Sequence, residues 1–179
     1  MKNTNIKFII YCALFTSLGV LFPMIFHMFG AVSGQTFLPM HIPVLIAGLL
    51  ISPYCGLVVG ILSPFLSCLI TQMPTMVKMP FMCVELAVYG LSAGLFMRLY
   101  SKKIKNKTAT LYLSLVSSQI CGRIANLMCT YVAVNLLGVT AKGVDVKLAL
   151  MSIPAGFVGI LIQWIIIPPV VRILSKLKK

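Results

Sequence analysis

Long apolar stretches separated by short breaks are the feature that most limits how this chain can fold. They make up most of its 179 residues, of which 60% are hydrophobic and only 9% are charged. A soluble domain carries about 25% charged residues, so this composition excludes one. Because a membrane-crossing helix needs about 20 apolar residues, the length predicts an all-α, polytopic membrane protein. We expect a single domain, residues 1–179, built as a compact bundle of six transmembrane helices.

The breaks between the apolar stretches locate these six helices, and the second one is unusually short. Between Pro43 and Pro53 there is room for about ten helical residues, about 15 Å of rise, whereas a bilayer core is about 30 Å thick. The phrases "LLISPYCG" and "GILSPFLS" echo each other, and we place them at the ends of helices 2 and 3. The expected ranges are 7–28, 40–52, from just after the "SPYCG" segment to 71, 79–100, 108–137 and 146–177.

Charge is distributed so as to orient such a bundle. The chain has 15 Lys and Arg residues and only two acidic residues, Glu85 and Asp145, which gives a net charge of +13. The cations flank apolar segments, which is how membrane topology is set, so we expect contact with membrane lipid and none with nucleic acid. One side of the six-helix arrangement would hold Lys2, Lys7, Arg98, Lys102, Lys103, Lys105, Lys107, Arg172, Lys176, Lys178 and Lys179, and the other only Lys78, Lys142 and Lys147. Both termini are therefore predicted to be cytoplasmic, with the protein multi-pass in the cell membrane.

Two charges, Glu85 and Arg123, fall within predicted membrane helices. Glu85 lies about 9 Å below the outer end of helix 4, and Arg123 about 22 Å above the inner end of helix 5, at 1.5 Å of rise per residue. Both belong to the outer leaflet, so they can meet or share a ligand. Intramembrane charges are costly and mark candidate functional sites. The alternative is a buried ion pair that only fixes helix packing.

Polar residues accompany Arg123 along its helix. The spacing i, i+4, i+7, i+11 puts them on one face of an otherwise apolar helix, which favours a binding role. His41 and Gln35, near the first outer loop, are further candidates. Hydroxyls at Ser63, Ser67 and Thr71 instead favour bonds to the carbonyl four residues back. The stripe on helix 5 consists of Gln119, Arg123, Asn126 and Thr130.

Motifs for catalysis or metal binding are not found in the sequence. The six cysteines show no CxxC or Cys/His spacing, there is no GxxxxGK[ST] or HExxH, and no paired carboxylate occurs at helical spacing. We therefore predict no cofactor, no metal and no enzymatic activity. Two other classes stay open: a small intramembrane enzyme using Glu85 with His41 or His27, and a structural membrane subunit without a ligand.

With the short first loop, the curtailed helix 2 and the "KK" loop between helices 4 and 5, the chain resembles the substrate-binding S component of energy-coupling factor (ECF) vitamin transporters. The segment "LPMHIPVLIAGLLISPYCGLVVGILSPFLSCLITQMP" carries most of the resemblance. The resemblance implies a subunit that binds a vitamin from outside and docks on a transmembrane coupling subunit driven by two ATPases. It also implies docking through an AxxxA motif on helix 1. This chain has "ALFTS" there, with Ala13 and with Ser17 at the second small position.

The resemblance also suggests why helix 2 is short. A short helix 2 leaves room for the preceding segment, His27 to Pro39, to fold over a pocket as a lid. An Arg in that pocket favours a carboxylate or polarised carbonyl, and Glu85 favours a hydroxyl, amine or ring N–H. Pantothenate fits this pairing. Pyridoxine, a pyrimidine precursor of thiamine, folate and a queuine-like base remain open.

Overall fold

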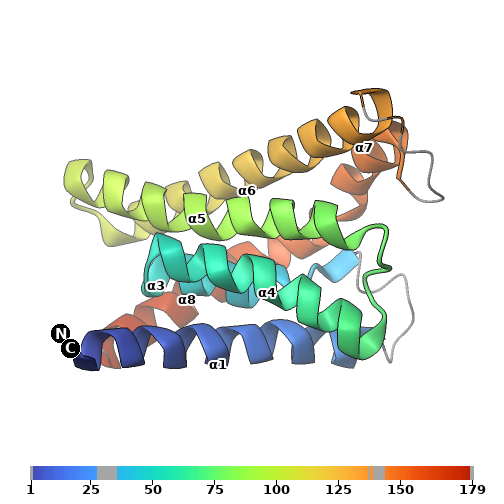
Figure 1. Ribbon diagram of the computed structural model, residues 1–179. Helices are drawn as coiled ribbons and strands as arrows, with labels where there is room; N and C mark the ends of the chain where they lie inside the picture. The colour runs from blue at the N-terminus through green and yellow to red at the C-terminus, as the bar shows by residue number, and fades with distance from the viewer. Residues whose placement is uncertain (1, 28–35, 137, 139–143, 178–179) are drawn as a thin grey trace.

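The regular secondary structure of the chain is entirely helical in the part that the computed structural model describes, residues 2–27, 36–136, 138 and 144–177. The all-α prediction is therefore confirmed. In the labels of Figure 1, the helices are α1 (Lys2–His27), α3 (His41–Leu50), α4 (Pro53–Thr71), α5 (Met79–Lys103), α6 (Lys107–Tyr131), the π-helical turn η1 (Val132–Leu136), α7 (Val146–Ala155) and α8 (Phe157–Leu177).

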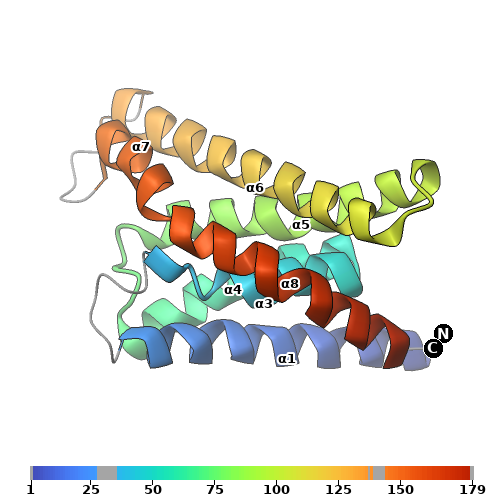
Figure 2. The ribbon, with the colours of Figure 1, turned by 180° about the vertical axis from the view of Figure 1, so that it is seen from behind.

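The short helix α3 lies in the middle of the bundle. Every residue from His41 to Leu49 is buried. The helix packs against α1, α4, α5, α6 and α8, and Figures 1 and 2 show it enclosed between longer helices. Its ten residues rise about 15 Å, so it fills the bundle interior without crossing a bilayer core.

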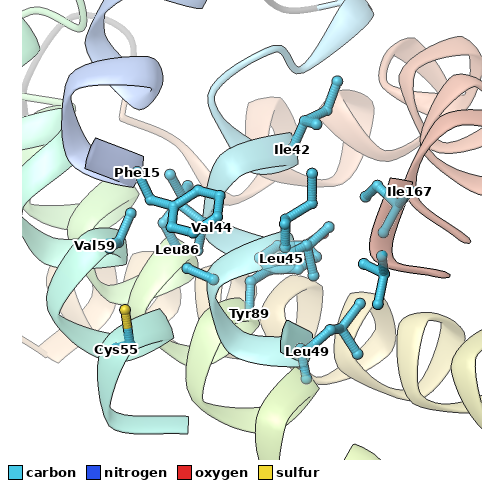
Figure 3. Packing of buried hydrophobic residues seen from close by; sticks show 14 of the residues in the cluster. Phe15, Ile42, Val44, Leu45, Leu49, Cys55, Val59, Leu86, Tyr89 and Ile167 are labelled. Carbon is cyan, nitrogen blue, oxygen red and sulfur yellow. The ribbon is translucent and has the colours of Figure 1, made fainter. Parts of the chain in front are cut away.

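Side chains from five helices form the apolar core around α3 (Figure 3). Val44 and Leu45 of α3 are completely buried at its centre. Apart from His41 at its start, this helix is apolar all round, as a helix surrounded by protein should be. The neighbouring helices contribute Phe15 from α1, Val59 from α4, Leu86 and Tyr89 from α5, and Ile167 from α8.

Glycines let α3, α4 and α5 approach closely. A Cβ atom on Gly90 of α5 would overlap the backbone carbonyl of Gly56 on α4, and one on Gly48 of α3 would overlap the carbonyl of Gly90. Small residues at such crossings are the usual means of helix association in membranes. This packing fixes the height of α5, which carries Glu85, relative to α3, which carries His41.

The two Ser-Pro phrases differ in structure. Ser52 caps α4, since its hydroxyl accepts a hydrogen bond from the Cys55 backbone N–H at 3.1 Å, and Pro53 occupies the first turn, where a missing N–H costs nothing. Pro64 instead lies inside α4, so the expected break at the second phrase is wrong. One well-capped Ser-Pro ends α3 and starts α4, whereas the other is accommodated within a helix.

The predicted helix over 146–177 is two helices, because α7 ends at Ala155 and α8 begins at Phe157. Pro154 has no N–H to continue the hydrogen-bond ladder, and Gly156 follows as the C-cap. The predicted helix over 108–137 continues from α6 into η1, and residue 137 lies outside the described part. The described residues thus hold seven α-helices where the sequence predicts six.

Four of the described helices are long and apolar enough to cross a membrane, namely α1, α4, α5 and α8. The shorter helices α3 and α7 are also apolar. Although α6 matches α5 in length, it is not among the four, since it carries Gln119, Arg123 and Asn126 along with several serines and threonines. Its polar residues are therefore the main departure from a lipid-compatible bundle.

The two ends of the bundle carry different connections. Figures 1 and 2 show the start of α1, the end of α8 and the α5–α6 connection at one end. The connection from α4 to α5 and helix α7 lie at the opposite end. The first end therefore collects the lysine-rich "SKKIKNK" segment and the basic last turn of α8.

Candidate functional site

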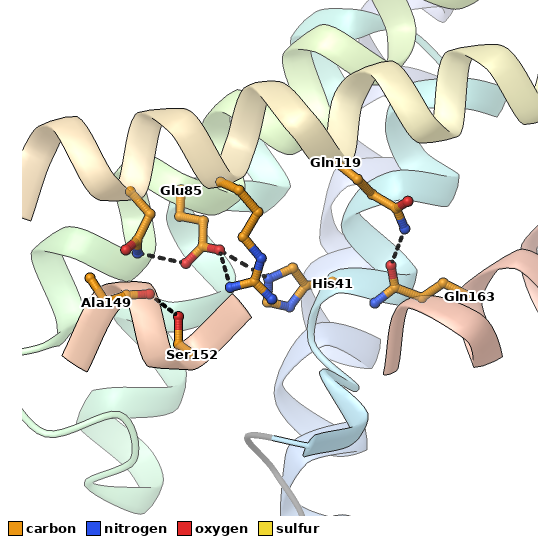
Figure 4. Close-up of polar contacts among 8 residues, drawn as sticks. His41, Glu85, Gln119, Ala149, Ser152 and Gln163 are labelled. Atoms are coloured by element: carbon orange, nitrogen blue, oxygen red, sulfur yellow. Dashed lines mark hydrogen bonds and ion pairs between the residues drawn. The ribbon is translucent and has the colours of Figure 1, made fainter. Parts of the chain in front are cut away.

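Glu85 of α5 is the centre of a buried polar cluster (Figure 4). The residue is only 5% exposed. Its Oε1 accepts a hydrogen bond from Nη1 of Arg123 at 3.2 Å, and its Oε2 accepts one from Nδ2 of Asn126 at 2.8 Å. Arg123 and Asn126 are three residues apart and so share one face of α6. The structure thus brings together the two intramembrane charges and one amide of the predicted stripe.

His41, the first residue of α3, completes this cluster from the other side. It is 2% exposed, and its Nε2 lies 3.8 Å from Oε1 of Glu85. Its ring meets the ring of Tyr89 edge-on, with centroids 5.0 Å apart. Tyr89 in turn lies against Gly122 of α6, where a Cβ atom would overlap the tyrosine ring. Tyr89 therefore packs beside His41, and Gly122 lets α6 come close to the tyrosine ring.

Four buried nitrogen atoms of the cluster have no hydrogen-bond partner among the described residues. They are Nε and Nη2 of Arg123 and both ring nitrogens of His41. Leaving a buried donor unpaired costs about 1–3 kcal/mol. Since Glu85 occupies Nη1, the two free atoms of Arg123 form one edge of the guanidinium. Such an edge offers two parallel N–H groups, the arrangement that binds a carboxylate with two hydrogen bonds.

The junction between α7 and α8 and the segment before α3 cover this edge. A Cβ atom on Gly156 would lie 2.6 Å from Nη2 of Arg123 and 3.0 Å from Cδ1 of Leu38. A Cβ atom on Gly159 would lie 2.7 Å from the backbone oxygen of Thr36. Leu38 itself has a φ of 50°, a left-handed conformation that a non-glycine residue adopts at some cost. The glycines of α8 and its N-terminal junction thus give the guanidinium and residues 36–38 room to pack.

Gln119 lies in a second polar cluster, one turn of α6 away from Arg123. Its Nε2 donates to Oε1 of Gln163 at 2.8 Å, and its Oε1 accepts from the indole N–H of Trp164 at 2.8 Å. Both ends of its amide are therefore engaged by α8. The structure does not bring Gln119 to Glu85, and the two clusters are joined only through α6 and the residues between them.

The other sequence-predicted residues are placed as follows. Thr130 is buried on α6, one turn beyond Asn126. Gln35 lies outside the described residues. Ala13 and Ser17 are exposed on α1, and the Ser17 hydroxyl donates to the Ala13 carbonyl of the same helix at 2.9 Å. They leave an exposed, small-residue strip on the outside of the bundle.

Two surface cavities lie away from the Glu85 cluster. One, of about 710 Å³, is formed by α6 and α8 with Tyr112, Trp164 and Arg172 in its wall. The other, of about 350 Å³, is formed by the end of α4 and the connection after it. Their walls hold none of the residues of the Glu85 cluster. The chemistry of the cluster, with its largely buried charges and unpartnered donors, makes it the stronger candidate site.

Sequence reasoning missed Tyr89 and Gly156, which shape the site, and it expected Gln163 of the second polar cluster only to pack or anchor its helix. The signal for Gln163 was available, since it is an amide in the middle of the apolar run "FVGILIQWIII". Tyr89 and Gly156 gave no such signal, because their roles depend on which helices face each other. The described residues contain no group of three His, Cys, Asp or Glu side chains able to hold a metal ion.

The apolar helices and the polar cluster buried among them define a helical, multi-pass membrane protein. Residues 7–171 match the family described as ECF transporter, substrate-specific component, and the chain belongs to this family. Members are binding subunits of transporters and are not enzymes. The resemblance drawn from the sequence is thereby confirmed. No curated protein and no solved structure matches the chain.

Proposed function

We propose that this protein captures a water-soluble vitamin or related micronutrient that carries a carboxylate, and that Arg123 binds this carboxylate. The free Nε–Nη2 edge of Arg123 is the observation that carries the proposal. Glu85 and Asn126 hold the guanidinium from the opposite side, so the edge is oriented before the substrate arrives. Preorganisation of this kind reduces the entropy lost on binding.

Pantothenate is the favoured substrate among the candidates, since it combines a carboxylate with amide and hydroxyl groups. Folate also carries carboxylates. Pyridoxine, a pyrimidine precursor of thiamine and a queuine-like base lack the group that the Arg123 edge matches best, and they rank below these two. The two ring nitrogens of His41 make no hydrogen bond with the described residues, so His41 can both donate to and accept from such a ligand, depending on its tautomer.

The substrate enters, in this proposal, from the outer side. Glu85 is about 9 Å from the start of α5, by the rise of an α-helix, so the cluster is near the end opposite the lysine-rich connection. Both termini and that connection would then be cytoplasmic, following the excess of Lys and Arg. Residues 36–38 and the α7–α8 junction cover the guanidinium, so they must move for the substrate to reach it.

The protein would work with partners that supply energy. We propose docking through the exposed Ala13–Ser17 strip of α1 onto a transmembrane coupling subunit that two ATPases drive. Small residues allow two helices to approach closely in a membrane. The whole chain, residues 1–179, would form one domain with six membrane crossings. Helices α7 and α8 together would make the last crossing, and α3 would complete the second only with its flanking segments.

Thermal unfolding of the purified protein with small-molecule probes tests the proposal. The probes are pantothenate, folate, pyridoxine and panthenol, in which a hydroxymethyl group replaces the carboxylate of pantothenate. We expect pantothenate or folate to raise the melting temperature, since a ligand that binds only the folded state stabilises it. Panthenol, the matched control, should give a clearly smaller shift than pantothenate. If neither carboxylate stabilises the protein, the proposal is wrong.

A further inference from the structure

Gln163 of α8 is a buried amide of which only half is used. It is 1% exposed, and its Oε1 accepts the hydrogen bond from Gln119. Its Nε2, which carries two N–H donors, has no partner among the described residues. Buried amides in membrane helices normally satisfy their donors, because lipid offers no acceptor. The free end of Gln163 therefore calls for an acceptor that is not part of the described chain.

The unpartnered nitrogens of the described chain are concentrated on three residues. Five buried side-chain nitrogen atoms lack a hydrogen-bond partner there, and they belong to Arg123, His41 and Gln163. Figure 4 shows the amide of Gln163 extending from α8 toward His41. Helices α3 and α8, which carry these two residues, pack against each other. The free donors thus lie on three helices, α6, α3 and α8, each of which packs against the other two.

We infer that Gln163 contacts the substrate directly, through its Nε2. The inference rests on the proposed function and extends its site by one helix. The substrate would then have two separate acceptor groups: a carboxylate at Arg123, and a carbonyl or hydroxyl oxygen at Gln163. A molecule with a single polar end would leave one set of buried donors unpaired, which costs about 1–3 kcal/mol per group.

A purely structural role explains only part of the geometry. Gln163 holds α8 to α6 through its oxygen, and Trp164 does the same through its indole N–H. Each residue makes one of the two bonds to Gln119. The Nε2 of Gln163 contributes nothing to this contact, so a residue selected for packing alone has no need of it.

The two bonds to Gln119 supply a matched pair of variants. Gln163→Met leaves Nε2 of Gln119 unpaired, and Trp164→Phe leaves its Oε1 unpaired. Each removes one bond of the same contact, but only Gln163→Met also removes the unpartnered Nε2 donors. Calorimetry with pantothenate as the probe, or with folate if only folate binds the unaltered protein, gives Kd for each.

We expect Gln163→Met to raise Kd at least tenfold, and Trp164→Phe to change it less than threefold. If Gln163→Met does not fold, Gln163→Glu is the second variant, since it keeps the oxygen that Gln119 uses and lacks the amide nitrogen. It should also raise Kd at least tenfold. Melting temperatures of the Gln163→Met and Trp164→Phe proteins without probe show whether losing either bond to Gln119 destabilises the fold equally.

Two results would overturn the inference alone: a Kd for the Gln163 variant within threefold of the unaltered protein, or equal increases in Kd for the Gln163 and Trp164 variants. The second result would assign the effect to the contact between α6 and α8. Failure of the unaltered protein to bind either pantothenate or folate would instead contradict the proposed function, and the inference with it.

Discussion

Arg123 and Glu85 form an ion pair in which the two side chains have different roles. Both oxygens of Glu85 are occupied by α6, so the carboxylate serves to position the guanidinium. Arg123 uses one of its nitrogens for this and keeps one edge free. The pair is largely shielded from solvent, with side-chain exposures of 13% for Arg123 and 6% for Glu85. Such a pair contributes little net stability, but breaking it leaves an uncompensated charge.

The first prediction at this scale concerns that pair. Glu85→Gln and Arg123→Met should each destabilise the folded protein, by about 3–5 kcal/mol if the remaining charge stays buried. The double variant should recover most of this loss, because neither charge remains. Thermal melting of the two single variants and the double variant in the same detergent measures the effect. Losses that simply add would show that the two side chains do not interact.

The position of a single side chain was predictable where it depends only on the geometry of its own helix. Counting residues from the helix ends placed Glu85 and Arg123 at one depth, and the regular rise of a helix makes such counting reliable. Thr71 donates to the carbonyl of Ser67, as the hydroxyl pattern predicts. The same prediction is wrong for the other two hydroxyls, because Ser67 donates forward to the Met73 carbonyl and the Ser63 hydroxyl has no partner among the described residues. Gln119 shows where this reasoning stops. Periodicity put it on the face of Arg123, but only the position of α8 decides that Gln163 and Trp164 engage it.

At the scale of the helices, the positions where helices begin and end are set by local residues such as proline and glycine, whereas the burial of a helix depends on how the other helices pack around it. The break between α3 and α4 was readable from Ser-Pro, but α4 begins at Pro53 and not after "SPYCG", because Ser52 caps it and proline fits the first turn. The end of α7 carries Pro154 and Gly156, which are also breakers, yet the long apolar run around them masked the signal. The central position of α3 was not readable from its ten residues, since it depends on five other helices closing around it.

Helix α1 carries the prediction at this scale. Its Ala13–Ser17 strip is exposed, so a bulky side chain there should not disturb the core. Ala13→Trp should abolish co-purification with the transmembrane coupling subunit and leave the melting temperature of the solitary protein unchanged. Leu14→Trp, one residue away on another exposed face, is the matched control and should co-purify normally. Equal effects of the two variants would remove the strip from the proposed interface.

At the scale of the whole molecule, charge and polarity divide the bundle into two ends. The lysine-rich connection and the basic end of α8 lie at one end, and the start of α5, with Glu85 two turns inside it, lies toward the other. In the proposed topology, a substrate held near the second end would be far from the cations at the first end. The positions of Lys and Arg along the sequence were sufficient to predict this division. The covering of Arg123 could not be predicted in this way, because it depends on the packing of residues 36–38 against α8.

The central claim is that the free edge of Arg123 recognises a carboxylate, and calorimetry with pantothenate and panthenol tests it most directly. The unaltered protein should bind pantothenate at least tenfold more tightly than panthenol, a difference of about 1.4 kcal/mol. Arg123→Met should weaken pantothenate binding by more than tenfold and bring the two affinities to within threefold of each other. An Arg123→Met protein that is folded and still prefers pantothenate tenfold would contradict the claim.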